Sequence, residues 1–191
     1  MKIIVFGAAF DPPHLGHQLM VETVLELGLA DGVWLMPAKR HPFLKSLSPD
    51  HHRLAMLELM VVKLADQRVK ISQHELNQDR VSFTYQTLVE LKKANPEVVF
   101  SFLIGSDNLA QFHLWNQYQQ MLEEFTFYVY PRLGFEMKPL YPGMIPLKDV
   151  EQVDTSSTQI RILVKDRQPI GHLVSLNITE YIAQNKLYLP E

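Results

Sequence analysis

The sequence predicts an α/β fold in which a parallel sheet of about five to six strands is covered by helices on both faces. Five short apolar runs are typical of buried strands, and helical patterns lie between them. The runs cover residues 2–6, 32–37, 69–72, 98–105 and 125–131. Because strands that alternate with helices favour a parallel sheet wound on both sides, we expect a Rossmann-like, doubly wound sheet.

The first strand leads into a glycine-opened loop and then into a helix. Residues 2–6 are apolar after Lys2, and Gly7 ends the run. The following loop contains Asp-Pro-Pro at residues 11–13, a composition typical of turns. From residue 18 to 29 the apolar positions recur with helical spacing, at Met20, Val21, Val24, Leu25 and Leu27. A strand, a tight loop and a buried helix are therefore predicted for residues 1–29.

Two histidines lie where this helix begins. The start of a helix presents unpaired N–H groups and the positive end of the helix dipole, and both attract phosphate. His14 and His17 are three residues apart, so their imidazoles share one face if the first turn reaches His14. They could contact polyphosphate oxygens and carry positive charge when protonated. The residues alone leave two alternatives to this role. The histidines could be a structural pair, or they could bind zinc as His-x-x-His, although no third ligand is obvious nearby in the sequence.

The second strand is followed by a basic loop, residues 39–45. A loop past the carboxyl end of a strand is either a ligand-binding segment or a solvated connection. Ser48 and Pro49 predict the start of the next helix, with Ser48 as its cap. The polar cluster at residues 51–53 is predicted to be solvated in its first turn. The core face of this helix is predicted at Leu54, Leu57, Val61 and Leu64.

Two more helices are predicted after the third and fourth strands. A polar stretch runs into a helix capped by Ser82 or Thr84. The strand of residues 98–105 is the strongest after the first, and the residues just after Gly105 can cap a second helix. The apolar face of that helix is predicted at Leu109, Phe112, Trp115 and Tyr118. At this spacing Trp115 is most simply a core residue.

A second phosphate-binding segment is predicted near the C-terminus. Ser157 can cap a short helix on which Arg161 lies one turn further along. Hydroxyls, free N–H groups and a guanidinium would then converge on one ligand. An ordinary capped turn is the alternative. The segment that begins at about residue 155 would complete the site at the histidines only if it folds over the first strand.

Composition limits the class of protein. The chain has 191 residues, 47% of them apolar, which suits a single domain spanning residues 1–191. A net charge of −3 argues against nucleic-acid binding, and the absence of cysteine excludes thiolate chemistry. With no signal-like leader and no apolar run of roughly 20 residues, we expect no membrane association and a cytoplasmic protein. Gly-x-Gly-x-x-Gly and Walker A are absent, which disfavours dinucleotide oxidoreductases and P-loop kinases.

The two phosphate-binding segments resemble known signatures. Gly-x-x-Phe-Asp-Pro-x-His-x-Gly-His over residues 7–17 is similar to the motif of the His-x-Gly-His nucleotidylyltransferase superfamily, and its Phe-Asp-Pro-Pro-His looks most like the bacterial nicotinate-mononucleotide adenylyltransferases. Ser-Ser-Thr-x-Ile-Arg over residues 156–161 resembles the C-terminal signature of that superfamily, with Thr155 in place of isoleucine. Ala8 and Ala9 depart from the family, which usually has a second glycine followed by Thr or Ser. Softer similarities between the two segments extend the resemblance over nearly the whole chain.

The resemblance implies transfer of the adenylyl group of ATP to nicotinate mononucleotide in NAD biosynthesis, with Mg²⁺ carried by ATP. Carried over residue by residue, it implies a catalytic set of His14, His17 and Arg161. The implied ATP-binding residues are Gly7, Ala8, Phe10, His14, Gly16, His17, Ser156, Ser157, Thr158 and Arg161. The implied mononucleotide-binding residues are Lys45, Thr84, Gly105, Asp107, Trp115 and Arg132, with the indole of Trp115 stacked on the pyridine ring.

Other functions stay open at this point. The acceptor could instead be nicotinamide mononucleotide or another phosphomonoester, because backbone N–H groups that recognise a carboxylate leave no trace in the sequence. A nucleotide-binding sensor without turnover is the alternative from another class, and it rests on Ala8 and Ala9. The partners implied are small molecules, with no nucleic acid and no metal site in the protein itself. The sequence leaves a homo-oligomer open.

Overall fold

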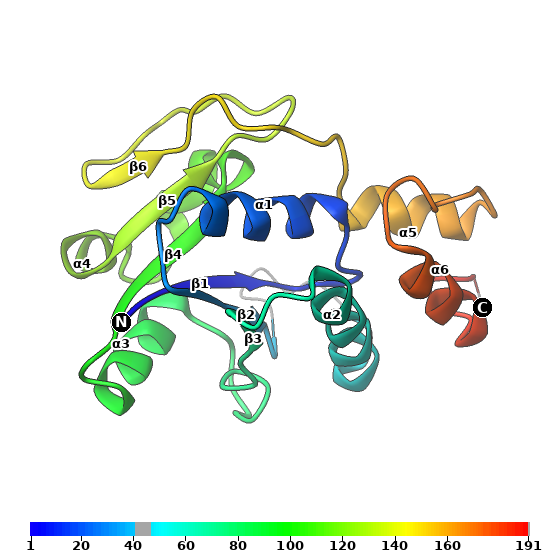
Figure 1. Ribbon diagram of the computed structural model, residues 1–191, viewed down its shortest axis with the longest axis horizontal. Helices are drawn as coiled ribbons and strands as arrows, with labels where there is room; N and C mark the ends of the chain where they lie inside the picture. The colour runs from blue at the N-terminus through cyan, green and yellow to red at the C-terminus, as the bar shows by residue number, and fades with distance from the viewer. Residues whose placement is uncertain (41–46, 191) are drawn as a thin grey trace.

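The chain forms one sheet in which every neighbouring pair of strands is parallel. The structure is a computed structural model that describes residues 1–40 and 47–190 (Figure 1). The strand order across this six-stranded sheet is β3-β2-β1-β4-β5-β6. The strands are β1 (Lys2–Ala8), β2 (Gly32–Pro37), β3 (Val69–Ile71), β4 (Val99–Gly105), β5 (Thr126–Tyr130) and β6 (Met144–Pro146). The predicted doubly wound parallel sheet is therefore confirmed.

Helices bury both faces of the sheet. They are α1 (Leu15–Glu26), α2 (Asp50–Leu64), α3 (Thr84–Ala94), α4 (Tyr118–Glu124), α5 (Ser157–Lys165) and α6 (Leu176–Gln184), with a 3₁₀ helix η1 (Ser106–Leu114). Along β1 the side chains alternate between two cores. Ile4 and Phe6 pack with residues of α1, α2, α5 and α6, whereas Ile3 and Val5 pack with residues of α3, η1 and α4. Since β1 is buried on both sides, its sequence is a continuous apolar run.

The order of the strands reverses at the centre of the sheet. β2 lies on one side of β1 and β4 on the other, so the connections after β1 and β4 leave in opposite directions. At such a reversal the carboxyl ends of the two strands open a crevice, where open α/β sheets bind ligands. Figure 1 shows α5 and α6 beyond this end of β1, beside the start of α1. The first and last segments of the chain therefore meet at the crevice.

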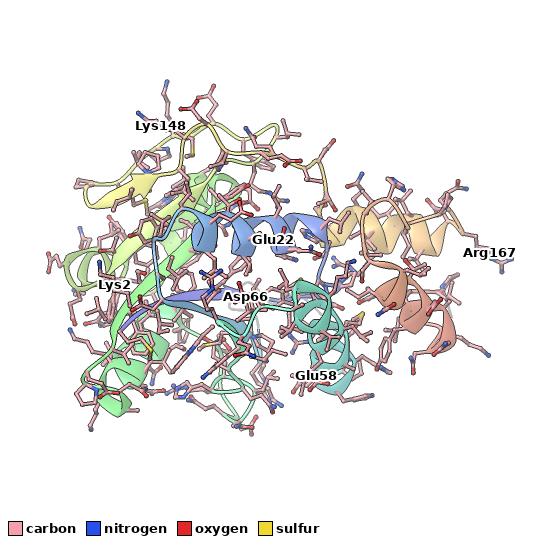
Figure 2. All side chains as sticks on the ribbon, viewed as in Figure 1. Lys2, Glu22, Glu58, Asp66, Lys148 and Arg167 are labelled. Atoms are coloured by element: carbon pink, nitrogen blue, oxygen red, sulfur yellow. The ribbon has the colours of Figure 1, made fainter. Side chains whose placement is uncertain are left out.

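Charged side chains lie mostly on the outside of the molecule. Lys148 and Arg167, labelled in Figure 2, extend from separate edges and are exposed. The polar residues that are buried are Asp11, His14, His17, Thr23, Arg53, Thr87, Ser106 and Thr155. Several of them surround the crevice, which makes them informative about the site. Over residues 1–40 and 47–190, no helix combines the length and apolar character needed to span a membrane.

Two elements differ from the sequence-based prediction. A single helix carrying both Trp115 and Tyr118 is wrong: η1 ends before Trp115, and α4 begins at Tyr118. Gln117 between them has a φ of 54°, a left-handed backbone that a continuous right-handed helix cannot contain. β6 was not predicted, because an edge strand of three residues within the proline-rich stretch 139–146 leaves no apolar run.

The start and the core face of α2 were predicted only in part. Pro49 precedes its first turn, so Ser48 is not its cap. Of the core face predicted at Leu54, Leu57, Val61 and Leu64, Leu57 is fully buried, and Val61 and Leu64 are partly buried and pack against the core. The buried residues are Arg53, Met56, Leu57 and Met60. Because leucines, methionines and valines occur all round this helix, periodicity alone could not tell which of them meets the sheet.

Arg53 was expected to be solvated, yet its side chain is 0% exposed. Its Nη1 donates to the carbonyl of Ala9 at 2.8 Å and its Nε to the carbonyl of Ser48 at 3.1 Å. Its Nη2 donates to Oδ1 of Asp50 at 2.6 Å. A buried guanidinium is tolerated because these groups take up its donors. Through Arg53, α2 holds the loop that follows β1.

We predict that Arg53→Met lowers the free energy of unfolding by about 2–3 kcal/mol, since it removes the donors to the carbonyls of Ala9 and Ser48 and to Oδ1 of Asp50. Arg68→Met is the matched control, because Arg68 also pairs with an aspartate, Asp66, but its side chain is 49% exposed. Urea denaturation followed by circular dichroism measures both losses. Equal losses in the two variants would show that the burial of Arg53 contributes nothing.

Candidate active site

A cavity of about 820 Å³ opens at the crevice between the carboxyl ends of β1 and β4. Its walls come from the loop after β1, the residues after β4, the start of α3 and the start of α5. Thirteen of the residues predicted for the site line it: Gly7, Ala8, His14, His17, Thr84, Gly105, Asp107, Trp115, Arg132, Ser156, Ser157, Thr158 and Arg161. Residues from the predicted ATP set and from the predicted mononucleotide set thus share one cavity.

His14 and His17 form a stacked pair at the start of α1. Their ring centroids are 3.6 Å apart with an interplanar angle of 24°. The backbone N–H of His14 donates to Nδ1 of His17 at 3.2 Å. Because Nδ1 accepts this hydrogen bond, a neutral His17 carries its proton on Nε2. The fold therefore fixes the tautomer of His17 and leaves Nε2–H as its side-chain donor.

Both histidines are neutral at physiological pH in the ligand-free site. Burial and, to a smaller extent, the nearby Arg132 guanidinium together lower the pKa of His17 to about 3. Burial, His17 and Arg132 also hold the pKa of His14 well below its usual value. A bound polyphosphate would oppose the effect of Arg132, because its negative charge favours imidazolium. Without ligand, the pair acts through N–H donors and not through charge.

Arg132 lies beside the start of α1. Its Nη1 is so close to Gly16 that a Cβ at residue 16 would lie 3.2 Å from it. Its Nη2 donates to the carbonyl of Thr155, and its backbone N–H donates to Oγ of Ser106 at 2.9 Å. Predicted as a mononucleotide residue, Arg132 thus reaches the histidine pair as well. It stands between the two ends of the cavity.

The C-terminal segment docks directly on the loop after β1. Ser157 Oγ donates to the carbonyl of Pro12 at 2.9 Å, and Arg161 Nη1 donates to the carbonyl of Asp11 at 2.6 Å. The predicted cap of α5 is shifted by one residue: Ser156 and not Ser157 is the N-cap, and its hydroxyl accepts the backbone N–H of Gln159 at 3.1 Å. The shift frees the Ser157 hydroxyl to hold the loop.

The opposite end of the cavity is an aromatic slot. Trp115 follows η1 and lies against Phe112, with ring centroids 5.1 Å apart, and against Phe102 at 6.3 Å. Its indole is partly exposed and lines the cavity, so Trp115 is more than a core residue. Thr84 at the start of α3 and Asp107 in η1 line the same cavity. A flat apolar wall with polar groups around it suits a ring with polar substituents.

Two of the predicted residues that the structure describes are not part of the cavity lining. Phe10 is only 1% exposed and packs edge-on against His17, at 5.0 Å between ring centroids, so it supports the histidine from behind. Gly16 is buried in α1 and makes room for the Arg132 guanidinium. Lys45 is outside the residues that the structure describes, so its predicted role stays a prediction.

Sequence reasoning missed a polar contact near the slot. Glu75 lines the cavity and accepts a hydrogen bond from the Thr87 hydroxyl at 2.7 Å, and burial raises the pKa of this carboxyl. Ser82 lies beside it and accepts the backbone N–H of Lys39 at 3.0 Å. These contacts join the residues after β2 to the start of α3. A half-buried glutamate in a polar loop carries no recognisable signal in a single sequence.

The metal-binding capacity of the site is limited. Among the residues that the structure describes, no group of three or more His, Cys, Asp or Glu could hold a metal ion. The segments at the histidine end supply imidazole, hydroxyl, backbone and guanidinium groups. These are phosphate ligands, whereas Mg²⁺ prefers carboxylate, phosphate and water oxygens.

The chain is similar to known proteins over almost its full length. A family model described as cytidylyltransferase-like matches residues 5–162. A probable nicotinate-nucleotide adenylyltransferase of Bacillus licheniformis is 33% identical over 189 residues, and the nicotinate-nucleotide adenylyltransferase of Bacillus subtilis is 31% identical over 189 residues; each match covers 98% of both chains. A solved structure of Plasmodium falciparum nicotinic acid mononucleotide adenylyltransferase complexed with NaAD shares the fold, with a TM-score of 0.82 and 20% identity over 98% of this chain and 97% of that one.

The fold and its cavity define a nucleotide-binding protein of the doubly wound α/β class. Its sequence similarity narrows that class. The chain belongs to the cytidylyltransferase-like family and, within it, to the nicotinate-nucleotide adenylyltransferases.

The buried neutral histidines predict a specific pH dependence of stability. A histidine whose pKa is lowered by folding binds a proton more readily in the unfolded chain, so stability is lost as the pH falls from about 6.5 towards the folded pKa of about 3. His17→Asn removes this proton linkage and keeps a side-chain acceptor for the His14 N–H. The stability advantage of wild type over the variant should shrink by about 1 kcal/mol per pH unit below pH 6.

Urea denaturation of both proteins between pH 8 and pH 5 measures this difference. The carboxylates elsewhere titrate in both proteins and cancel in the comparison. Curves of unfolding free energy against pH that stay parallel would contradict the neutral, buried state of His17.

Proposed function

We propose that the protein transfers the adenylyl group of ATP to nicotinate mononucleotide, forming nicotinate adenine dinucleotide and pyrophosphate in NAD biosynthesis. One observation carries the proposal. The two phosphate-binding segments, residues 7–17 and 156–161, meet in a single cavity whose other end is an aromatic slot. Membership of the nicotinate-nucleotide adenylyltransferases supports the choice of acceptor.

The reaction needs no general base. The second pKa of a phosphate monoester is about 6, so the mononucleotide phosphate is largely a dianion at neutral pH. One of its oxygens attacks the α-phosphorus of ATP, and the bond from that phosphorus to the bridging oxygen of the β-phosphate breaks. Pyrophosphate leaves with that bridging oxygen. Catalysis therefore reduces to bringing two anions together and stabilising the charge on the transferring group.

The cavity offers donors for that purpose. We assign His17 Nε2–H to the α-phosphate, and His14 and Arg161 to the β- and γ-phosphates. The side chains or N–H groups of residues 156–158 would complete the ATP site from the C-terminal segment. Arg132 stands between this end and the slot, so it could contact the phosphates of both substrates. Neutral donors whose orientation is fixed by the fold need no reorganisation when charge develops.

The aromatic slot would take the nicotinate ring. Trp115 offers the side chain with the best face for a flat pyridinium cation, and Phe102 and Phe112 hold its indole in place. Thr84, Gly105 and Asp107 are proposed to contact the rest of the mononucleotide. Lys45 keeps the role that the family resemblance implies. Mg²⁺ would arrive bound to the phosphates of ATP, where it would offset part of their negative charge.

Two alternatives can be separated from this proposal by one assay. Nicotinamide mononucleotide differs from the acid only in its amide. A sensor without turnover is suggested by Ala8 and Ala9, which line the cavity where the family usually has glycine and a hydroxyl residue. The purified protein is incubated with ATP, Mg²⁺ and each mononucleotide, and pyrophosphate is measured. Release with the acid is expected; release with the amide alone, or ATP binding without release, would support an alternative.

We predict that His17→Ala lowers the turnover number by roughly 100-fold or more, the usual effect of removing a donor that stabilises transition-state charge. His172→Ala is the matched control, since His172 is exposed and lies outside the cavity. Steady-state pyrophosphate release gives the turnover of both variants, and thermal melting checks that they are folded. A folded His17→Ala protein with normal turnover would remove His17 from the catalytic role.

A further inference from the structure

The carboxylate of Asp11 is buried in the loop after β1, but it does not line the cavity. The residue is 2% exposed, and both carboxylate oxygens have partners within the protein. Oδ2 accepts the backbone N–H of Ser48 at 3.0 Å, and Oδ1 accepts the hydroxyl of Tyr188 at 2.7 Å. Asp11 therefore ties the loop to the residues before α2 and to the C-terminal tail.

Tyr188 reaches this loop from a position four residues beyond α6. It borders a second hollow of about 270 Å³, of which Thr158 and Arg161 are also walls, and these two residues line the main cavity as well. Arg161 itself donates to the carbonyl of Asp11. The backbone of Tyr188 has a φ of 64°, a left-handed conformation that is strained for a tyrosine. The Tyr188 hydroxyl thus contacts Asp11, the loop residue that is also bound by Arg161, a proposed ATP ligand.

We propose that Tyr188 is a positioning residue for ATP: through Asp11 it holds the loop of residues 7–14 in the conformation that binds the triphosphate. The loop ends at His14, and its carbonyls at Asp11 and Pro12 accept the donors of α5. A loop that leaves this conformation part of the time binds ATP more weakly, in proportion to the time it spends away. Tyr188 acts on ATP without touching it.

The effect should be confined to one substrate. The loop and α5 form the phosphate end of the cavity, whereas the aromatic slot is built from α3, η1 and the residues that follow them. Tyr181 provides a matched comparison within the same C-terminal segment. Its hydroxyl lies 3.0 Å from Nδ1 of His52 on α2, away from the loop after β1. Each tyrosine hydroxyl thus contacts the first half of the chain, and only that of Tyr188, which also lies 4.0 Å from Sδ of Met56, reaches the loop.

The test compares Tyr188→Phe with Tyr181→Phe. Each substitution removes one hydroxyl and keeps the ring. Calorimetric titration with Mg²⁺ and ATP, without mononucleotide, should show the dissociation constant of ATP raised about tenfold in Tyr188→Phe, the factor expected for a lost buried hydrogen bond to a charged group. It should be unchanged in Tyr181→Phe, and the KM for nicotinate mononucleotide should be unchanged in both. Equal ATP affinities in the two variants would overturn the proposal. So would a Tyr188→Phe protein in which the dissociation constant of ATP and the KM for nicotinate mononucleotide rise by the same factor.

A second substitution tests the route through Asp11. If Tyr188 acts through this carboxylate, Tyr188→Phe should weaken ATP binding less in an Asp11→Asn background than in wild type, and full additivity would overturn the route. Should Tyr188→Phe fail to melt cooperatively, Asp11→Asn alone must weaken ATP binding and leave the KM for the mononucleotide unchanged, or the proposal fails.

The inference rests on the proposed function only in taking ATP as the ligand. Wild type that binds ATP but releases no pyrophosphate would refute that function and leave the ATP comparison valid.

Discussion

The loop between β1 and α1 is held by hydrogen bonds from parts of the chain that are far away in sequence. Its carbonyl and carboxylate oxygens accept donors from α2, α5 and the C-terminal tail. The contacts are Arg53 to Ala9, Ser157 to Pro12, and Arg161 and Tyr188 to Asp11. Because a buried carbonyl without a partner is costly, the loop can keep this shape only when all these elements are in place. The remainder of the site is built around it.

This constraint explains why the two ends of the chain must meet. α5 places Ser157 and Arg161 where they both satisfy the loop and face the cavity, so one set of contacts serves folding and ligand binding together. Arg132 also connects these two segments, because its guanidinium donates to the carbonyl of Thr155 just before α5 and lies beside Gly16 at the start of α1. The phosphate end of the cavity is therefore a product of the complete fold, and no single motif could form it alone.

The sequence predicted the sheet and thirteen of the residues that line the cavity, because those depend on local signals. Apolar runs ended by glycine or proline mark β1, β2 and β4, and the family signatures mark the phosphate segments. What it could not predict depends on partners without a sequence signal. Arg53 is buried because it meets backbone carbonyls, and the face of α2 is set by what packs on it. Likewise Ser156 and Ser157 are chemically alike, and only the docking of α5 decides which one caps the helix and which one holds the loop.

The neutrality of the histidine pair follows from the same packing. Phe6 and Phe10 lie against His17, at 5.6 Å and 5.0 Å between ring centroids, so the imidazole is removed from water on that side. Removal from water disfavours imidazolium, and Arg132 disfavours it further. In a site proposed to receive a triphosphate, the arginines thus supply the positive charge, and the histidines act as oriented N–H donors. In the ligand-free site the pKa of His17 lies far below neutrality, so the mononucleotide phosphate, with its second pKa of about 6, is expected to contribute to the pH dependence of the proposed reaction.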